Sequence, residues 1–256
     1  MCTVIFIPEN NKKVFVSLRD ESPVRPKAIL PKIYNTLNMN YLAPKDALAG
    51  GTWIGVNEFR NVIILLNGAF ENHHKNEKYI LSRGIIVNQL LASSLPVIDW
   101  NLLEMNNIEP FTLVIWSENK LFQLVWDGEK KFRYLLDESI PHIFSSSTLY
   151  NSEAKIEREE KFNNWMVKHP RISKTSVLHF FETFKENQNG FLMNRNELVK
   201  TLSYSFIELS DGKKATFNYY DFSTLSYQLS NLSLKTISKN CLLTEFRIQK
   251  STVKID

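Results

Sequence analysis

The chain has 256 residues, of which 43% are hydrophobic, and its formal net charge is +4. The longest apolar runs are about five residues, far short of the roughly 20 that a membrane-spanning helix needs, and the lysines and arginines are spread along the chain, which speaks against nucleic-acid binding. Because the N-terminus lacks the basic flank and long apolar stretch of a secretory signal, we expect a single cytoplasmic domain over residues 1–256.

The first predicted element is a hairpin. Residues 2–7 and 14–18 are rich in β-branched and aromatic side chains, as strands are, and a polar stretch of turn-forming residues separates them. If Ile7 pairs with Val14, the antiparallel register places Cys2 opposite Arg19. The segment Arg19-Asp20-Glu21 then lies beside the N-terminus, where it forms either part of a binding pocket or an ordinary salt-bridged strand end.

Cys2 is a candidate nucleophile. A small residue at this position allows removal of Met1, and Cys2 would then carry a free α-amine whose reference pKa of roughly 8 suits a base near neutral pH. A nucleophile paired with the N-terminal amine is an established arrangement for acyl transfer. The alternative is that Cys2 merely happens to follow Met1. The other cysteine, Cys241, is too distant in sequence to suggest a disulfide framework or a metal site.

Residues 20–49, with four prolines, are expected to be largely irregular and to form a pocket wall or a surface wrap. A second hairpin is predicted from residues 50–56 and 61–66, with a turn between them. In this register Asn67 faces Gly50. The side-chain amide of Asn67 is a suitable oxyanion donor, although an Asn before Gly68 is also typical of a turn.

The remaining elements alternate in groups. Helices are expected over 79–93, over 152–168 and from 173 or 174 to 184. In the second of these, Ile156, Phe162, Trp165 and Met166 are expected on the buried side, and Arg158 on the charged, solvated side. The expected strands are 111–117, 121–127, 132–136, 200–209, 214–222 and 244–249. Antiparallel strands with helices in separate groups predict an α+β fold.

Several short segments together resemble one family. They are Met1-Cys2-Thr3, Arg19-Asp20-Glu21, Ala49-Gly50-Gly51-Thr52-Trp53-Ile54-Gly55-Val56, Leu66-Asn67-Gly68-Ala69-Phe70 and Ser82-Arg83-Gly84. Their order and spacing resemble the NRDE family, also called the transport and Golgi organisation protein 2 family. Leu18 stands where the naming motif Asn-Arg-Asp-Glu has its Asn.

This family is distantly similar to N-terminal nucleophile hydrolases of the choloylglycine-hydrolase and penicillin-acylase type. The resemblance implies a four-layer αββα sandwich, with Cys2 as nucleophile, Arg19 and Asp20 at the pocket and Asn67 as oxyanion donor. A further family Asn belongs in the region 145–151, where Asn151 is instead expected to begin a helix. A late Arg that these hydrolases use has no assigned counterpart in the sequence.

Two functions follow. The first is a hydrolase or acyltransferase that cleaves an amide bond of a small-molecule or acyl substrate through Cys2 and requires no cofactor. The second, suggested by proposals of haem mobilisation and lipid or acyl-CoA metabolism for the family, is a non-catalytic carrier of haem or of an acyl or lipid ligand. His73 and His74 are then the candidate haem contacts, although adjacent histidines in a polar loop are typically solvent-facing.

Overall fold

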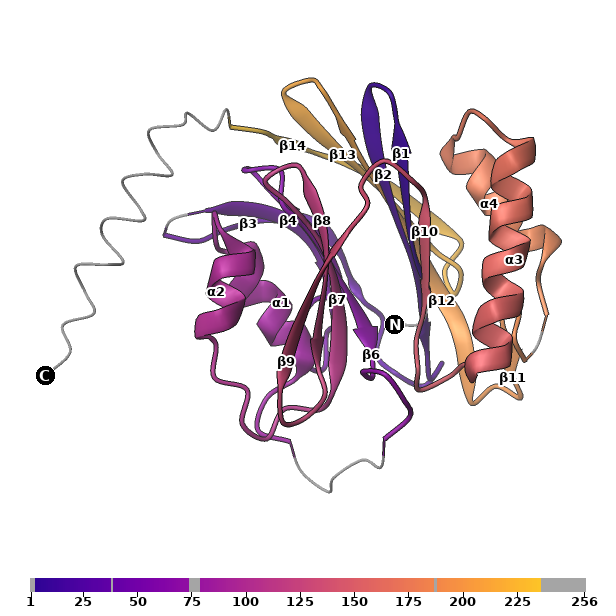
Figure 1. Cartoon of the computed structure of the whole chain (residues 1–256), viewed down its shortest axis with the longest axis horizontal. Helices are drawn as coiled ribbons and strands as arrows, with labels where there is room; N and C mark the ends of the chain where they lie inside the picture. Colours follow the sequence, from indigo (N-terminus) through magenta and orange to yellow (C-terminus); the bar gives the residue numbers. More distant parts are fainter. Residues whose placement is uncertain (1–2, 38, 74–78, 187, 236–256) are drawn as a thin grey trace, which may run out of the picture.

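The computed structural model describes residues 3–37, 39–73, 79–186 and 188–235. Within these ranges the chain forms two antiparallel sheets of seven strands each, stacked face to face. Helices α1 (Arg83–Leu91) and α2 (Pro96–Leu102) cover one sheet, and α3 (Ser152–Lys168) and α4 (Lys174–Thr183) cover the other (Figure 1). The α+β class and the αββα layer order are therefore confirmed. None of the described helices is long and apolar enough to cross a membrane.

The strands fall into two sets. The first sheet holds β1 (Thr3–Glu9), β2 (Lys12–Glu21), β10 (His142–Ser145), β11 (Asn194–Arg195), β12 (Val199–Ser210), β13 (Lys214–Asp221) and β14 (Ser226–Ser233). The second holds, in chain order and in spatial order, β3 (Ile29–Asn35), β4 (Asn40–Lys45), β5 (Ile54–Asn57), β6 (Val62–Asn67), β7 (Phe111–Ser117), β8 (Lys120–Trp126) and β9 (Lys131–Leu136).

The hairpin of β1 and β2 has the predicted register. Ile7 pairs with Val14, and Thr3 pairs with Leu18. Because successive side chains of a strand point to opposite faces, Val4 and Phe6 contribute to the core between the sheets, whereas Ile5 and Ile7 belong to the core under α3 and α4. Both faces of β1 are thus buried, which explains its nearly continuous apolar sequence.

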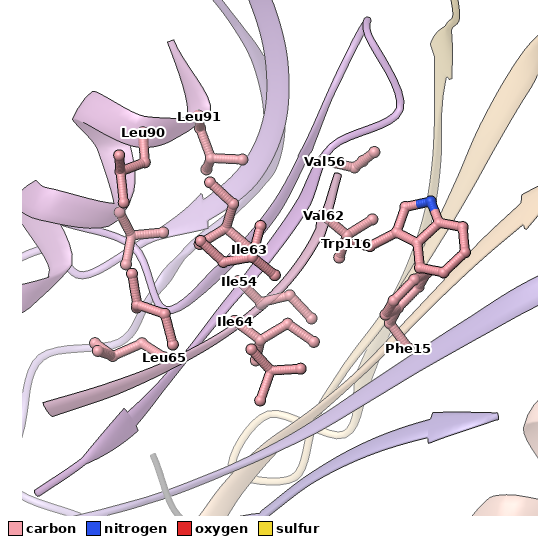
Figure 2. Close-up of a cluster of buried hydrophobic side chains, with 14 of the residues drawn as sticks. Phe15, Ile54, Val56, Val62, Ile63, Ile64, Leu65, Leu90, Leu91 and Trp116 are labelled. Carbon is pink, nitrogen blue, oxygen red and sulfur yellow. The ribbon is translucent and has the colours of Figure 1, made fainter. Parts of the chain in front are cut away.

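Two apolar layers flank β6 (Figure 2). Val62 points toward Trp116 and Phe15 in the space between the sheets, and the ring centroids of these two aromatic residues are 6.1 Å apart. On the opposite face, Ile63 and Leu65 point toward α1, where Leu90 and Leu91 meet them. The run of five apolar residues at 62–66 therefore belongs to a strand that is buried on both sides.

The outer helices begin at residues with capping side chains. The side chain of Asn151 accepts a hydrogen bond from the backbone N–H of Ala154 (3.0 Å), which places Asn151 at the N-cap of α3, as expected. Ser173 and Ser176 form a reciprocal capping box at the start of α4, which satisfies backbone donors that a helix otherwise leaves open.

The expectation of an irregular segment over 20–49 is wrong, because β3 and β4 lie within it. Pro31 is tolerated because β3 is an edge strand, the position in a sheet where a missing N–H costs least. Pro44 lies beyond the only residues of β4 that pair with β5, Tyr41 and Leu42. Four elements, α2, β10, β11 and β14, were also missed. The helix expected over 79–93 begins only at Arg83.

The predicted faces of α3 need correction at two positions. Ile156 was expected to be buried but is 58% exposed, and Arg158, expected on the solvated side, is only 1% exposed. Ala154, Arg158 and Phe162 follow each other at four-residue spacing and share the buried side of the helix. Charge alone therefore misplaced Arg158. The strand expected over 244–249 and the cysteine Cys241 lie outside the described residues.

Candidate active site

Four of the five segments that carried the family resemblance contribute residues to one cavity of about 420 Å³. It takes residues from the end of β2 in one sheet and from β6 in the other. Its lining consists of Arg19, Glu21, Arg25, Asp46, Ala49, Gly51, Thr52, Trp53, Leu65, Asn67, Tyr79, Leu81, Ser82, Arg83, Gly84 and Glu109. Residues as far apart in the sequence as Arg19 and Glu109 thus line a single pocket, of the size usual for small-molecule sites.

Arg19 is buried at the wall of this cavity, with 4% exposure. Its Nη2 donates to Oδ2 of Asp46 at 2.8 Å, and its guanidinium lies over the ring of Trp53, 4.6 Å from the centroid. A planar cation held by a carboxylate on one side and an aromatic face on the other has a fixed orientation. The salt-bridged strand end that the sequence left open is therefore present, and it lies inside the pocket.

Asp46 binds two arginines. Arg25 contacts it through both Nε (2.6 Å to Oδ2) and Nη2 (3.1 Å to Oδ1), and the backbone N–H groups of Leu48 and Ala49 donate to Oδ1. Burial acts to raise the pKa of Asp46, but the hydrogen bonds from Arg25 and Ala49 and the charges of Arg25 and Arg19 outweigh it and lower the pKa below its ordinary 3.8. The carboxylate is therefore charged at neutral pH.

Asp20 faces a second, smaller cavity of about 200 Å³, which shares Glu21, Asn67, Arg83 and Glu109 with the first. Its Oδ1 accepts a hydrogen bond from Oγ1 of Thr201 at 2.6 Å, across the pairing of β2 with β12. Neighbouring residues of one strand thus serve the two cavities, Arg19 the larger and Asp20 the smaller.

Asn67 lines both cavities. It ends β6, directly before Gly68, whose φ is +80°, so the strand-end position and the turn that the sequence offered as alternatives are both present. The expectation that it faces Gly50 is wrong. The pairing of β5 with β6 starts at Ile54, and Asn67 pairs with Phe111 of β7 instead.

The glycine before β5 and the glycine in α1 allow two backbone segments to come close together. A Cβ on Gly51 would lie 2.4 Å from the carbonyl carbon of Gly84, and one on Gly84 would lie 2.8 Å from the carbonyl oxygen of Thr52. The N–H of Thr52 donates to the oxygen of Gly84 at 3.1 Å. This contact between two backbones holds the first residues of α1, including Arg83, against the pocket.

The segment after β10 reaches Asn67 with serines. Oγ of Ser146 donates to the backbone oxygen of Asn67 at 2.7 Å, and Oγ of Ser147 lies 2.3 Å from where a Cβ on Gly68 would be. Asn151, the asparagine of this segment, uses its side chain as the helix cap of α3.

His73 lies at the smaller cavity. Its Nε2 is 3.3 Å from Oε1 of Glu109, and Oε2 of the same carboxylate is 3.0 Å from Nη2 of Arg83. Cys2 and His74 lie outside the described residues. The part of the chain that the structure describes has no group of three or more His, Cys, Asp or Glu residues arranged for a metal ion.

Four charged residues near the site were missed from the sequence: Arg25, Asp46, Glu109 and Arg158. Arg158 of α3 donates through Nη2 to Oγ1 of Thr3 (2.5 Å) and through Nε to Oγ of Ser145 (3.0 Å). It thereby anchors the first described residue of β1. Its spacing from Ala154 and Phe162 was the signal that could have revealed it.

Comparisons with known proteins agree with this fold. A variant of conjugated bile acid hydrolase from Clostridium perfringens matches with a TM-score of 0.57 and 11% identity over 93% of this chain and 99% of that one. A Caenorhabditis elegans N-acylethanolamine-hydrolyzing acid amidase orthologue matches with a TM-score of 0.52 and 12% identity over 80% and 92%. No curated protein matches the sequence.

At these identities the two structures establish the fold, which is that of the N-terminal nucleophile hydrolases. The family described as Transport and Golgi organisation 2 matches residues 1–238, nearly the whole chain. The resemblance of the short segments is thereby confirmed, and the chain belongs to the Transport and Golgi organisation 2 family.

Proposed function

We propose that the protein is an N-terminal nucleophile hydrolase or acyltransferase that cleaves amide bonds through Cys2 after removal of Met1. The observation that supports this most is the register of the first hairpin. Thr3, the first described residue, pairs with Leu18, which directly precedes Arg19. Arg19 and Asn67 line one cavity, and the similar solved structures are a hydrolase and an amidase by name.

In the proposed reaction, the α-amine of Cys2 accepts the proton of the thiol, and the thiolate attacks the amide carbonyl. The amide N–H of Asn67 stabilises the oxyanion that forms. The protonated α-amine then gives its proton to the leaving amine, and a thioester remains. Water attacks the thioester in hydrolysis, and a second amine attacks it in acyl transfer.

Arg19 and Asp20 have separate roles in this proposal. The guanidinium of Arg19, held by Asp46 and Trp53, favours the thiolate by its charge. Asp20 offers a carboxylate that orients the α-amine, and Thr201 holds that carboxylate in place from β12. The two roles need opposite charges at neighbouring positions, which the end of β2 supplies.

The test combines mass and activity. Intact mass is expected to show loss of Met1, and Cys2→Ala is expected to abolish release of amine from a panel of acyl amides, whereas Cys241→Ala leaves it unchanged. Retention of Met1 on an active protein, or full activity in the Cys2→Ala protein, would refute the mechanism. Circular dichroism of each variant checks that the fold is intact.

A carrier of haem or of an acyl or lipid ligand is the second candidate. It is favoured by His73, whose Nδ1 is buried and has no hydrogen-bond partner among the described residues. The carrier function predicts that haem titration gives a Soret shift that His73→Ala removes, with no hydrolysis of any amide in the panel. A Soret shift that is identical in His73→Ala would contradict this contact.

A further inference from the structure

Six charged side chains line the larger cavity, three of each sign. The cations are Arg19, Arg25 and Arg83, and the anions are Glu21, Asp46 and Glu109. They form two clusters. In one, Asp46 binds Arg19 and Arg25, and Glu21 lies 3.9 Å from Arg25; in the other, Glu109 binds Arg83. The cavity is thus lined by fixed, balanced charge.

A charged group lies over the aromatic ring of Trp53 in this cavity. The indole of Trp53 is the widest flat side chain of the lining, but the guanidinium of Arg19 lies over its ring at 4.6 Å. An alkyl chain in this space would displace the water that hydrates the charged groups. Because the chain cannot form the hydrogen bonds that this water forms, its binding there is unfavourable. The cavity therefore suits a polar ligand.

Arg25 has donor capacity that its partners do not use. Its Nε and Nη2 are both bonded to Asp46, while its Nη1 is 3.9 Å from Oε2 of Glu21, beyond hydrogen-bond distance. The side chain is 27% exposed and lines the cavity. Because Asp46 holds the guanidinium by two bonds, Nη1 is presented in a fixed place, as carboxylate recognition requires.

We propose, building on the function above, that the substrate is a small polar amide bearing a carboxylate, and that Arg25 binds this carboxylate through Nη1. Arg25 is then a specificity residue, since it contacts a part of the substrate that does not react. Amides with long alkyl chains are excluded from the larger cavity by its charged lining.

The experiment measures binding to the full chain carrying Cys2→Ala, so that the probes are not consumed. The probes are N-acetyl-L-alanine, its uncharged counterpart N-acetyl-L-alaninamide, and N-dodecanoylethanolamine, each titrated by calorimetry. We expect the carboxylate probe to bind at least tenfold more tightly than either other probe. Adding Arg25→Gln is expected to remove this advantage, and adding Arg133→Gln, at an exposed site on β9, to leave it unchanged.

Arg25→Lys guards against a folding artefact. A lysine keeps the charge but cannot bind Asp46 through two nitrogens and a ligand through a third, so an intermediate advantage is expected. Equal binding of the three probes, tighter binding of the dodecanoyl probe, or an undiminished advantage in Arg25→Gln would each overturn the proposal.

Turnover by the wild-type protein separates the two proposals. If N-acetyl-L-alanine binds as expected but no acetate is released, the specificity holds and the proposed reaction is wrong. If N-dodecanoylethanolamine is cleaved faster than N-acetyl-L-alanine, the reaction holds and the specificity is wrong.

Discussion

At the scale of single residues, two buried charges organise the region around the site. Arg158 joins α3 to the start of β1, and it also donates to the backbone oxygens of Asn189 and Gly190. Asp46 joins Arg19 to Arg25. Each charge is surrounded by fixed partners, so the loss of either would leave several buried polar groups unpaired.

We expect Arg158→Ala to lower the free energy of unfolding by about 2–4 kcal/mol, because four hydrogen-bond acceptors lose their donor and the stacking on Tyr150 and Phe191 is lost. Arg158→Lys should retain only a minor part of the stability that Arg158 contributes. Urea denaturation measures both. Glu160→Ala, on the exposed side of the same helix, is the control and should change little. Equal losses in the two alanine variants would contradict this role.

Asp46→Asn should show a pH-dependent effect. Since the pKa of Asp46 is lower in the folded protein than its ordinary 3.8, its charge stabilises the fold above that value, and the contribution disappears as pH falls through the folded pKa. We expect a loss of about 3 kcal/mol at pH 7, as for a broken buried ion pair, and a smaller difference from wild type at pH 3, below the ordinary pKa of 3.8. A difference that does not shrink between these pH values would refute the charge effect.

At the scale of elements, the sequence predicted strands best where the pattern of apolar residues was clear. The β1–β2 register and the strands of residues 111–136 were correctly predicted because apolar, aromatic and β-branched residues predominate in each strand. Strands β3 and β4 were hidden by Pro31 and Pro44, which are tolerated only because of where each strand lies in its sheet. Such positions are set by tertiary pairing, which a single sequence does not reveal.

The site shows the same division. Arg19, Asp20 and Asn67 were chosen as candidates from strand ends and from the family resemblance, and all three line the two cavities, while their catalytic roles stay a prediction. Asp46 and Glu109 were not recognised, since Asp46 lies in the connection between β4 and β5 and Glu109 in the connection between α2 and β7, where no periodicity marks them. Their partners Arg25 and Arg83 are 21 and 26 residues away in the sequence, and only the folded chain brings them together.

The glycine contact between β5 and α1 provides a prediction at this scale. Gly51→Ala would place a methyl group 2.4 Å from the backbone of Gly84, so α1 must move away from the pocket. We expect a loss of at least about 1–3 kcal/mol and reduced activity, measured as Tm and amide cleavage. Gly212→Ala, in a turn where the nearest atom is 3.4 Å away, should leave activity unchanged. Equal behaviour of the two variants would show that the contact is unimportant.

At the scale of the whole molecule, the two sheets share one core. Residues of β1 and β2 pack with residues of β6 and β7 in a single cluster, and Phe15 of β2 lies against Trp116 of β7 within it (Figure 2). Each sheet therefore buries its inner face only against the other. This arrangement predicts that neither sheet is stable alone.

We expect one cooperative unfolding transition, with coincident curves from far-ultraviolet circular dichroism and tryptophan fluorescence. Phe15→Ala should shift both curves together and cost about 3–5 kcal/mol, whereas Tyr134→Ala, at an exposed position of β9, should shift neither. Two separate transitions would show that the sheets unfold independently and that residues 1–256 are not a single domain.

The hydroxyl of Ser146 has a consequence for how the pocket keeps its shape. Ser146 directly follows β10 of the first sheet, whose last residue Ser145 is paired with Thr3. Its hydroxyl donates a hydrogen bond to the backbone carbonyl of Asn67 in the second sheet. A shift of the first sheet relative to the second would therefore also move the pocket wall that contains Asn67. We therefore expect the pocket to be preformed, with the same distance between its two walls before and after a ligand binds.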